Sequence, residues 1–123
     1  MCLMRILPPP VAPTGFGFVA RKMFSGSYRS IFYNYETPQT LGVEQKAELF
    51  GDLISQEDAK RYPCGFHIFE SMDDAFDYAL TNSNEAVLHV SYRGAHTRGL
   101  QGARKVVVAE FITLIQEIKR DVS

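Results

Sequence analysis

Segments rich in aromatic and β-branched residues recur along this 123-residue chain, and turn-forming residues separate them. This pattern predicts β-strands, and the Ser-Gly-Ser turn after the first segment predicts a hairpin. In the first strand Phe16, Phe18 and Ala20 share one face, because successive side chains of a strand point to opposite sides. The predicted strands are GFGFVARKMF (15–24), YRSIFYNY (28–35), GFHIF (65–69) and AVLHVSY (86–92).

One segment shows the period of a helix. Ser71 precedes MDDAFDYAL, and Asp73 and Asp74 fall in the first turn, where negative charge complements free backbone N–H groups. We therefore expect a main helix at about residues 72–81, packed on one face of a sheet. Its apolar stripe comprises Met72, Ala75, Phe76, Ala79 and Leu80.

Residues 43–62 carry apolar side chains at spacings that also fit a helix, but Gly51 interrupts them. This segment predicts short helical turns, and Ser55 with Asp58 three residues later could cap the second. The apolar residues are Ala47, Leu49, Phe50, Leu53 and Ile54.

The C-terminal third begins with a segment that contains three glycines, RGAHTRGLQGARK (93–105), which predicts a long, flexible connection. The segment that follows, KVVVAEFITLIQEI (105–118), is ambiguous. Its apolar residues fit a helical stripe from about Ala109, whereas its β-branched residues favour a strand.

The length predicts one domain, and 46% hydrophobic with 22% charged residues is typical of a globular protein. We expect a Pro-rich N-terminal segment at 1–14 and a single α+β domain at 15–123. The fold class is α+β, with a mostly antiparallel sheet, one main helix and short helical turns in 43–62. Two cysteines suggest no disulfide framework, and no apolar run reaches the roughly 18 residues of a membrane helix, so we expect a cytoplasmic protein.

The net charge is −1, but the charges are unevenly distributed along the chain. Residues 1–35 sum to +4, residues 36–85 to −8 and residues 86–123 to +3. This distribution can create opposed surface potentials if the segments separate in the fold.

The C-terminal half resembles a group of small uncharacterised bacteriophage and prophage proteins. The resemblance lies in GFHIFESMDDAFDYA, in AVLHVSY with Gly94, and in KVVVAEFITLIQEI. In that group a Gly-Phe-His strand leads into a helix with an acidic start, then into two Val-rich strands. The resemblance implies that 105–118 is a strand, bent or bulged and antiparallel to 86–92, and it implies a phage setting without supplying an activity.

Two kinds of catalytic or metal site can be considered for the cysteine and the histidines. Cys64 and His67 could form a nucleophile and base, but their spacing does not bring the two groups together, so we assign them structural roles. His67, His89 and His96 follow no metal-ligand spacing. We expect no metal site and no cofactor.

An enzymatic alternative is a small ADP-ribosyltransferase-like protein that uses NAD. In that arrangement His67 contacts the nicotinamide ribose, Tyr92 stacks on the nicotinamide and Glu110 stabilises the oxocarbenium charge. This alternative rests on architecture alone. Whether the protein is an enzyme therefore stays open.

The leading hypothesis is a non-catalytic, phage-type accessory protein that binds a host or viral macromolecule. Its predicted contact surface is the basic connection, which has no acidic residue. A protein with an acidic surface is the expected partner and nucleic acid the second class, because flexible basic segments attract both. The predicted partner-binding residues are Arg93, His96, Arg98, Arg104 and Lys105.

Overall fold

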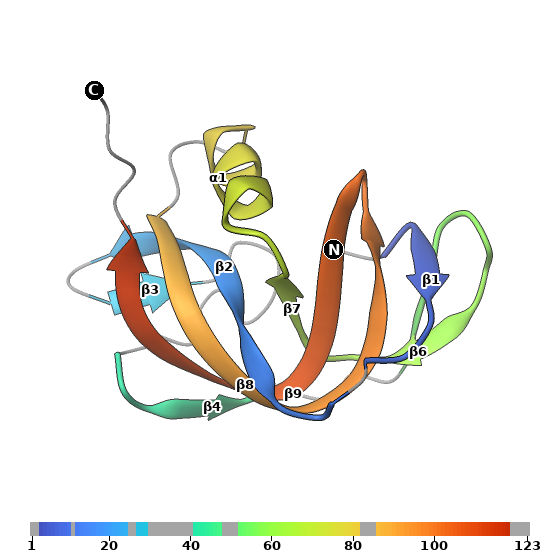
Figure 1. Cartoon of the computed structure of the whole chain (residues 1–123), viewed down its shortest axis with the longest axis horizontal. Helices are drawn as coiled ribbons and strands as arrows, with labels where there is room; N and C mark the ends of the chain where they lie inside the picture. The colour runs from blue at the N-terminus through green and yellow to red at the C-terminus, as the bar shows by residue number, and fades with distance from the viewer. Residues whose placement is uncertain are drawn as a thin grey trace.

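In a computed structural model, the described part of the chain forms a large antiparallel sheet, a small two-stranded sheet and one helix (Figure 1). The structure describes residues 3–10, 12–24, 27–29, 41–47, 52–81 and 86–118. The elements are β1 (Arg5–Leu7), β2 (Gly15–Phe24), β3 (Ser27–Arg29), β4 (Glu44–Lys46), β5 (Asp52–Ile54), β6 (Arg61–Pro63), β7 (Phe66–Phe69), α1 (Met72–Thr81), β8 (Ala86–Gln101) and β9 (Arg104–Ile118). The mostly antiparallel sheet with one helix confirms the broad α+β class.

Four strands close into a ring. β2 pairs with β8, β8 with β9, and β9 with β7, all antiparallel. Among the described residues, the ring closes between β7 and β2 through one residue pair, Phe18 opposite Phe69. At this closure a Cβ on Gly17 would lie 2.4 Å from Cγ2 of Ile68, so the two strands can approach only because residue 17 is glycine.

The interior of the ring is an apolar core that, among the described residues, the ring strands and Ala47 supply. Leu88 and Leu114 are fully buried, and each such side chain contributes roughly 1.5–3 kcal/mol to folding. We call this cluster the inner core. Its buried members are Val19, Ala47, Phe66, Ile68, Leu88, Val90, Ala109, Ile112 and Leu114.

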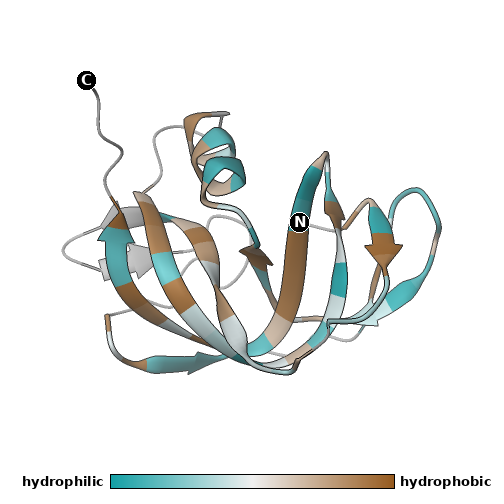
Figure 2. Ribbon diagram, viewed as in Figure 1, coloured by the Kyte–Doolittle hydropathy of each residue, from teal (hydrophilic) through white to brown (hydrophobic). Residues whose placement is uncertain are grey.

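The alternate residues of the same strands point outward, as Figure 2 illustrates by the alternation of apolar and polar positions along β8. Part of this outer side is covered by α1, β6 and the N-terminal residues, which together form a second cluster that we call the outer core. Its buried members are Leu3, Ala20, Tyr62, Phe69, Ala75, Tyr78, Ala79, Val87, Val106 and Val108.

The helix has the predicted bounds but buries a different stripe. Ala75, Tyr78 and Ala79 face the sheet, whereas Met72 is 42% and Leu80 64% exposed. The expectation that Met72 and Leu80 are buried is therefore wrong. The two alanines let the helix approach the strands closely.

The helical turns predicted in 43–62 are also wrong for the described residues. This segment contains the strands β4, β5 and β6, and β5 pairs with β6 in a separate two-stranded sheet. Ser55 and Asp58 lie in the turn between them, where Asp58 Oδ2 accepts a hydrogen bond from the backbone N–H of Ile6 at 3.0 Å. Three-residue strands are too short to show a periodicity of their own, and Leu49 and Phe50 lie outside the described residues.

The predicted hairpin is confirmed where it is described, because β3 pairs with β2 with Lys22 opposite Arg29. The ambiguous C-terminal segment is a strand, β9, as the resemblance implied. The prediction of a flexible connection at residues 93–105, in contrast, is wrong. β8 continues through it to Gln101, and only Gly102 and Ala103 form the turn to β9.

The glycines of this segment lie within β8, and their roles in the strand explain why a loop was predicted. Gly94 has a φ of +69° next to a register shift between Ala95 and Thr97, so it belongs to an irregular, bent part of the strand. At Gly99 a Cβ would lie 2.5 Å from the carbonyl oxygen of Arg5, so glycine lets β1 pair with β8.

In the part of the chain that the structure describes, no helix has the length and apolar character needed to cross a membrane.

Candidate functional site

Part of the outer side of the ring is left uncovered by α1. Phe16 of β2 lies opposite Ser91 of β8, which lies opposite Thr113 of β9, which lies opposite Glu44 of β4. Residues paired in this way share one face of a sheet, with Cβ atoms roughly 5 Å apart. This row therefore crosses four strands.

A second row runs beside the first one. Arg93 lies opposite Phe111, and Phe111 lies opposite Lys46, each two residues along its strand from a member of the first row. Residues two apart in a strand point to the same side. We call the surface formed by both rows the outer sheet face: Phe16, Ser91, Thr113, Glu44, Arg93, Phe111 and Lys46.

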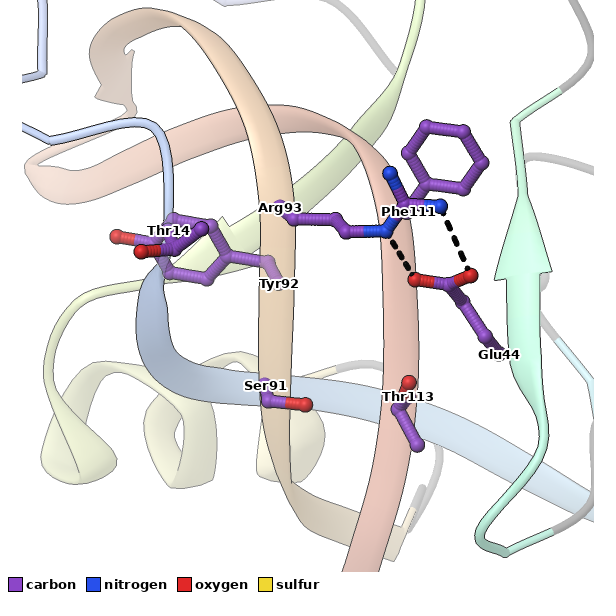
Figure 3. A pocket seen from close by; sticks show the side chains of 7 residues that line it. All are labelled: Thr14, Glu44, Ser91, Tyr92, Arg93, Phe111 and Thr113. Atoms are coloured by element: carbon purple, nitrogen blue, oxygen red, sulfur yellow. Dashed lines mark hydrogen bonds and ion pairs between the residues drawn. The ribbon is translucent and has the colours of Figure 1, made fainter.

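A pocket of about 230 Å³ opens on this face (Figure 3). Ser91 and Thr113 lie side by side on its β8–β9 wall, and the side chain of Arg93 extends across toward Glu44. Thr14 and Tyr92 line the opposite side. The full lining is Thr14, Glu44, Ser91, Tyr92, Arg93, Phe111 and Thr113.

Arg93 and Glu44 form a forked ion pair at the edge of the pocket. Nε of Arg93 lies 2.5 Å from Oε1, and Nη2 lies 3.0 Å from Oε2 (Figure 3). The hydrogen bonds from Arg93 lower the pKa of Glu44, and the same bonds raise the pKa of Arg93. Both groups are therefore charged at neutral pH.

The guanidinium of Arg93 also lies over the ring of Phe111, with Cζ 3.7 Å from the ring centroid. Lys46 approaches the same ring at 5.9 Å and pairs with Glu110 at 3.7 Å. A cation over an aromatic face is held by the ring quadrupole as well as by its carboxylate. Phe111 thus orients two cations on this surface.

The first row ends in an exposed aromatic ring. Phe16 is 70% exposed, and its ring lies 5.7 Å from that of His89 at an interplanar angle of 31°. The ring of Phe18 also lies 5.5 Å from the ring of His89, and Phe18 packs against the outer core. His89 thus contacts both phenylalanine rings of this face.

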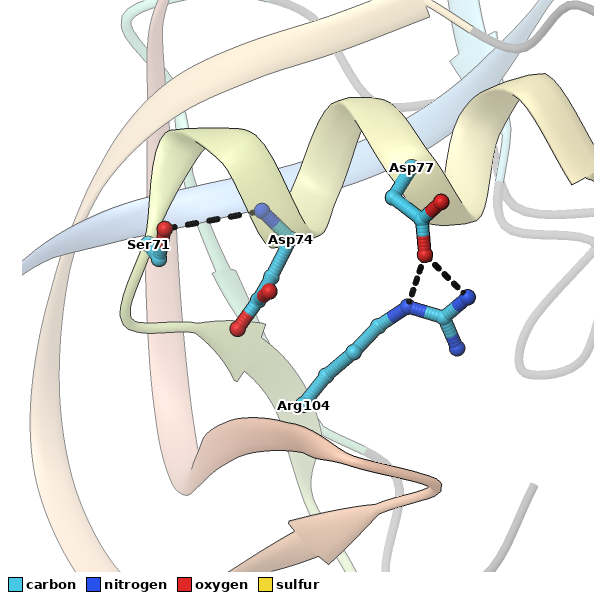
Figure 4. A network of polar contacts seen from close by, with 4 residues as sticks. All are labelled: Ser71, Asp74, Asp77 and Arg104. Atoms are coloured by element: carbon cyan, nitrogen blue, oxygen red, sulfur yellow. Dashed lines mark hydrogen bonds and ion pairs between the residues drawn. The ribbon is translucent and has the colours of Figure 1, made fainter.

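The five predicted partner-binding residues lie on strands and do not form one surface. Arg98 forks onto Glu70, with Nε–Oε2 at 2.6 Å, and both side chains are about 30% exposed (28% and 31%). Arg104 bonds Asp77 of α1, and Asp74 N–H bonds the Ser71 hydroxyl at the start of the same helix (Figure 4).

The remaining two predicted residues differ in their surroundings. His96 lies at the register shift of β8, and its Nδ1 is 2.7 Å from Oγ1 of Thr97. Burial lowers the pKa of His96. Lys105 is exposed at the start of β9. Of the five, the structure brings only Arg93 to the outer sheet face.

His67 is partly buried and lies beside Tyr62 of the outer core. Its Nε2 lies 3.4 Å from the hydroxyl of Tyr62, and that hydroxyl accepts the backbone N–H of Leu3 at 2.7 Å. Burial lowers the pKa of His67 to about 4, so the ring is neutral at pH 7. This agrees with a structural, hydrogen-bonding role. Cys64 is a buried free thiol.

The residues assigned to an ADP-ribosyltransferase lie in three different settings. His67 contacts Tyr62, Glu110 pairs with Lys46, and Tyr92 packs so close to residue 15 that a Cβ there would lie 2.6 Å from its hydroxyl. Burial raises the pKa of Tyr92. Among the contacts of the described residues, none joins any two of these three side chains.

The described residues contain no group of three or more His, Cys, Asp or Glu side chains placed to hold a metal ion.

Most residues of the outer sheet face were not predicted from the sequence. Alternation places Phe16 and Phe18 on one face, which is a usable signal. The contributions of Glu44, Phe111 and Thr113 depend on the register between strands, which no local pattern reports.

Comparisons with known proteins add no relative: no family model, no curated protein and no solved structure matches this chain.

Proposed function

We propose that this protein is a small, non-catalytic accessory protein of the phage type, which acts in the host cytoplasm by binding a host or viral macromolecule. The proposed contact surface is the outer sheet face. Of the predicted partner-binding residues, Arg93 belongs to it. The expected partner is anionic, either a protein with an acidic surface or a nucleic acid.

The exposure of Phe16 carries this proposal. A phenyl ring that is 70% exposed gains little from burial in the monomer, yet it lies in one row with the hydroxyls that line a pocket. Large apolar side chains beside a recess and rimmed by polar groups are typical of interaction sites.

The cations on this surface support an anionic partner. Arg93 and Lys46 are 54% and 62% exposed, and both lie beside the ring of Phe111. Their carboxylate partners stand in solvent, where ion pairs contribute little to stability. A partner can therefore compete for these cations without unfolding the protein.

Affinity capture from a host lysate tests the proposal when the variants are matched. Phe16→Ala and Arg93→Glu should each abolish capture of the partner that the wild-type protein retains. Ile54→Ala removes a comparably exposed side chain, 51%, from β5 in the other sheet and should retain capture. If Lys105→Glu abolishes capture while the first two variants retain it, the contact surface is the β8–β9 turn and this proposal fails.

A further inference from the structure

The exposed ring of Phe16 is held in an orientation suited to stacking. Its contact with His89 is tilted by 31° at a centroid separation of 5.7 Å, and His89 is in turn fixed by Phe18 at 5.5 Å. The contact with His89 thereby restrains the Phe16 ring while the side chain stays 70% exposed. A supported aromatic face open to solvent is the element on which proteins stack an unpaired base.

Cations occupy the neighbouring row at a distance that suits the same ligand. Arg93 is the diagonal neighbour of Phe16 across β2 and β8, a separation of roughly 7–8 Å between positions. Lys46 lies two strands farther along that row. An extended strand that stacks a base on Phe16 can bring successive phosphates to these two cations.

Hydroxyl groups lie between the ring and the cations. Ser91 and Thr113 are directly opposed and line the pocket, and Thr14 lines its other side. Serine and threonine hydroxyls commonly donate to phosphate and sugar oxygens, where they position a nucleic acid without reading its sequence. The pocket of about 230 Å³ lies where those oxygens would approach.

From these observations we infer that the outer sheet face binds single-stranded nucleic acid. Phe16 stacks on a base, and Arg93 and Lys46 hold phosphates on either side of Phe111. Ser91 and Thr113 contact the backbone between them. This inference rests on the proposed function and selects one of its two partner classes. An acidic protein would use the cations and could cover the ring of Phe16, but it does not require an aromatic face on which a base can stack.

The carboxylate of Glu44 opposes the binding of nucleic acid, and its removal therefore tests the inference. The carboxylate of Glu44 accepts hydrogen bonds from Nε and Nη2 of Arg93 but not from Nη1. Its negative charge also repels an approaching phosphate. Removing this charge should strengthen binding. Glu44→Gln keeps the shape of the side chain and is therefore expected to raise the affinity for nucleic acid several-fold.

The test measures fluorescence anisotropy of a labelled oligothymidylate of about 12 nucleotides, a length within the site sizes of known single-strand binders. Phe16→Ala should weaken binding by about 5- to 150-fold, the range that base stacking contributes. Arg93→Gln should also weaken it and should reduce the slope of log K against log salt by about 0.7, the value for one lost phosphate contact.

Two matched controls remove the same groups elsewhere. Ile54→Ala deletes an exposed apolar side chain, and Arg61→Gln deletes an exposed positive charge, both from the β5–β6 sheet. Neither should change the affinity by more than about twofold. Circular dichroism of every variant confirms that the fold is retained.

The outcomes separate this inference from the proposed function. Binding of oligothymidylate with the stated losses, the gain from Glu44→Gln and weaker binding of poly-L-glutamate support it. Equal binding of poly-L-glutamate, with no effect of Phe16→Ala on either probe, overturns it and leaves an acidic protein as the partner. No binding of oligothymidylate by the wild type also overturns it, while the lysate experiment still decides the proposed function.

Discussion

The two sides of the wall formed by β8 and β9 use the same strands for opposite purposes. On the inner side, Val90 and Leu114 are fully buried in the ring. On the outer side, their sequence neighbours Ser91 and Thr113 line a pocket open to solvent. One residue of displacement along a strand separates a position that stabilises the fold from a position that can contact a partner.

This difference shows how a small domain can carry a binding surface at low cost in stability. The inner core and the outer core already bury the apolar residues of the ring strands, so the outer sheet face does not have to be apolar. Its side chains are free to be charged, aromatic or hydroxylated. Substitutions on each side can therefore measure how independent the two sides are.

The largest difference is expected between the neighbours Leu114 and Thr113. Leu114→Ala leaves a cavity in the inner core and should reduce the free energy of unfolding by roughly 2–5 kcal/mol. Thr113→Ala should change it by less than about 0.5 kcal/mol. Urea denaturation of both variants measures the contrast, and equal losses would show that the outer row is also part of the core.

The next effect concerns His67, which lies in the covered part of the outer side. Its pKa falls from 6.5 to about 4 in the fold, so folding favours the neutral ring. The stabilisation is therefore complete above about pH 6.5 and is lost as the pH falls toward 4, by an amount on the order of 3 kcal/mol. Denaturation at a series of pH values should show this slope in the wild type.

His67→Gln provides the control for that experiment. Glutamine has no titrating group in this range, so the variant should lose stability at neutral pH but show a flatter dependence between pH 6.5 and 4. A variant with the same slope as the wild type would assign the pH dependence to other groups.

A smaller effect distinguishes the two forked arginines of β8. Arg98 and Glu70 are about 30% exposed (28% and 31%), whereas Arg93 is 54% exposed. Arg98→Gln should lower the free energy of unfolding by about 1 kcal/mol, a value already reduced for solvent screening. Arg93→Gln should cost less than Arg98→Gln. Thermal unfolding in low and high salt measures both, and the reverse order would contradict a binding role for Arg93.

The smallest effect on stability is expected at Phe16. Because its ring is 70% exposed, Phe16→Ala removes little buried surface and should leave the midpoint of urea denaturation almost unchanged. A large shift in this midpoint would mean that the ring supports the fold through His89. Any loss of binding by this variant could not then be assigned to stacking.

The elements that carry a regular local pattern could be predicted from the sequence. The helix after Ser71 has a cap, an acidic first turn and a periodic stripe, and β2 and β7 have turn residues at their ends. Predictions failed where pairing across the chain overrides local composition. Gly94 and Gly99 read as a loop, yet they allow a bend in β8 and the close approach of β1.

The candidate site was less accessible to sequence reasoning than the fold. Counting cations identified Arg93 but grouped it with Arg98 and Arg104, which pair with Glu70 and with Asp77 of α1. The charge composition does not predict which carboxylate pairs with which cation, because ion pairs such as Arg93 with Glu44 join positions 49 residues apart. The register that aligns two rows across four strands is likewise a property of the folded sheet.

The closure of the ring at Phe18 and Phe69 has a consequence for motion. A long ladder of paired residues joins β8 to β9, whereas one pair joins β2 to β7 among the described residues. Local separation at that junction breaks far fewer interactions than global unfolding does. Backbone amides along it should therefore exchange with deuterium well before those of the β8–β9 ladder, and water should first reach the inner core from that side.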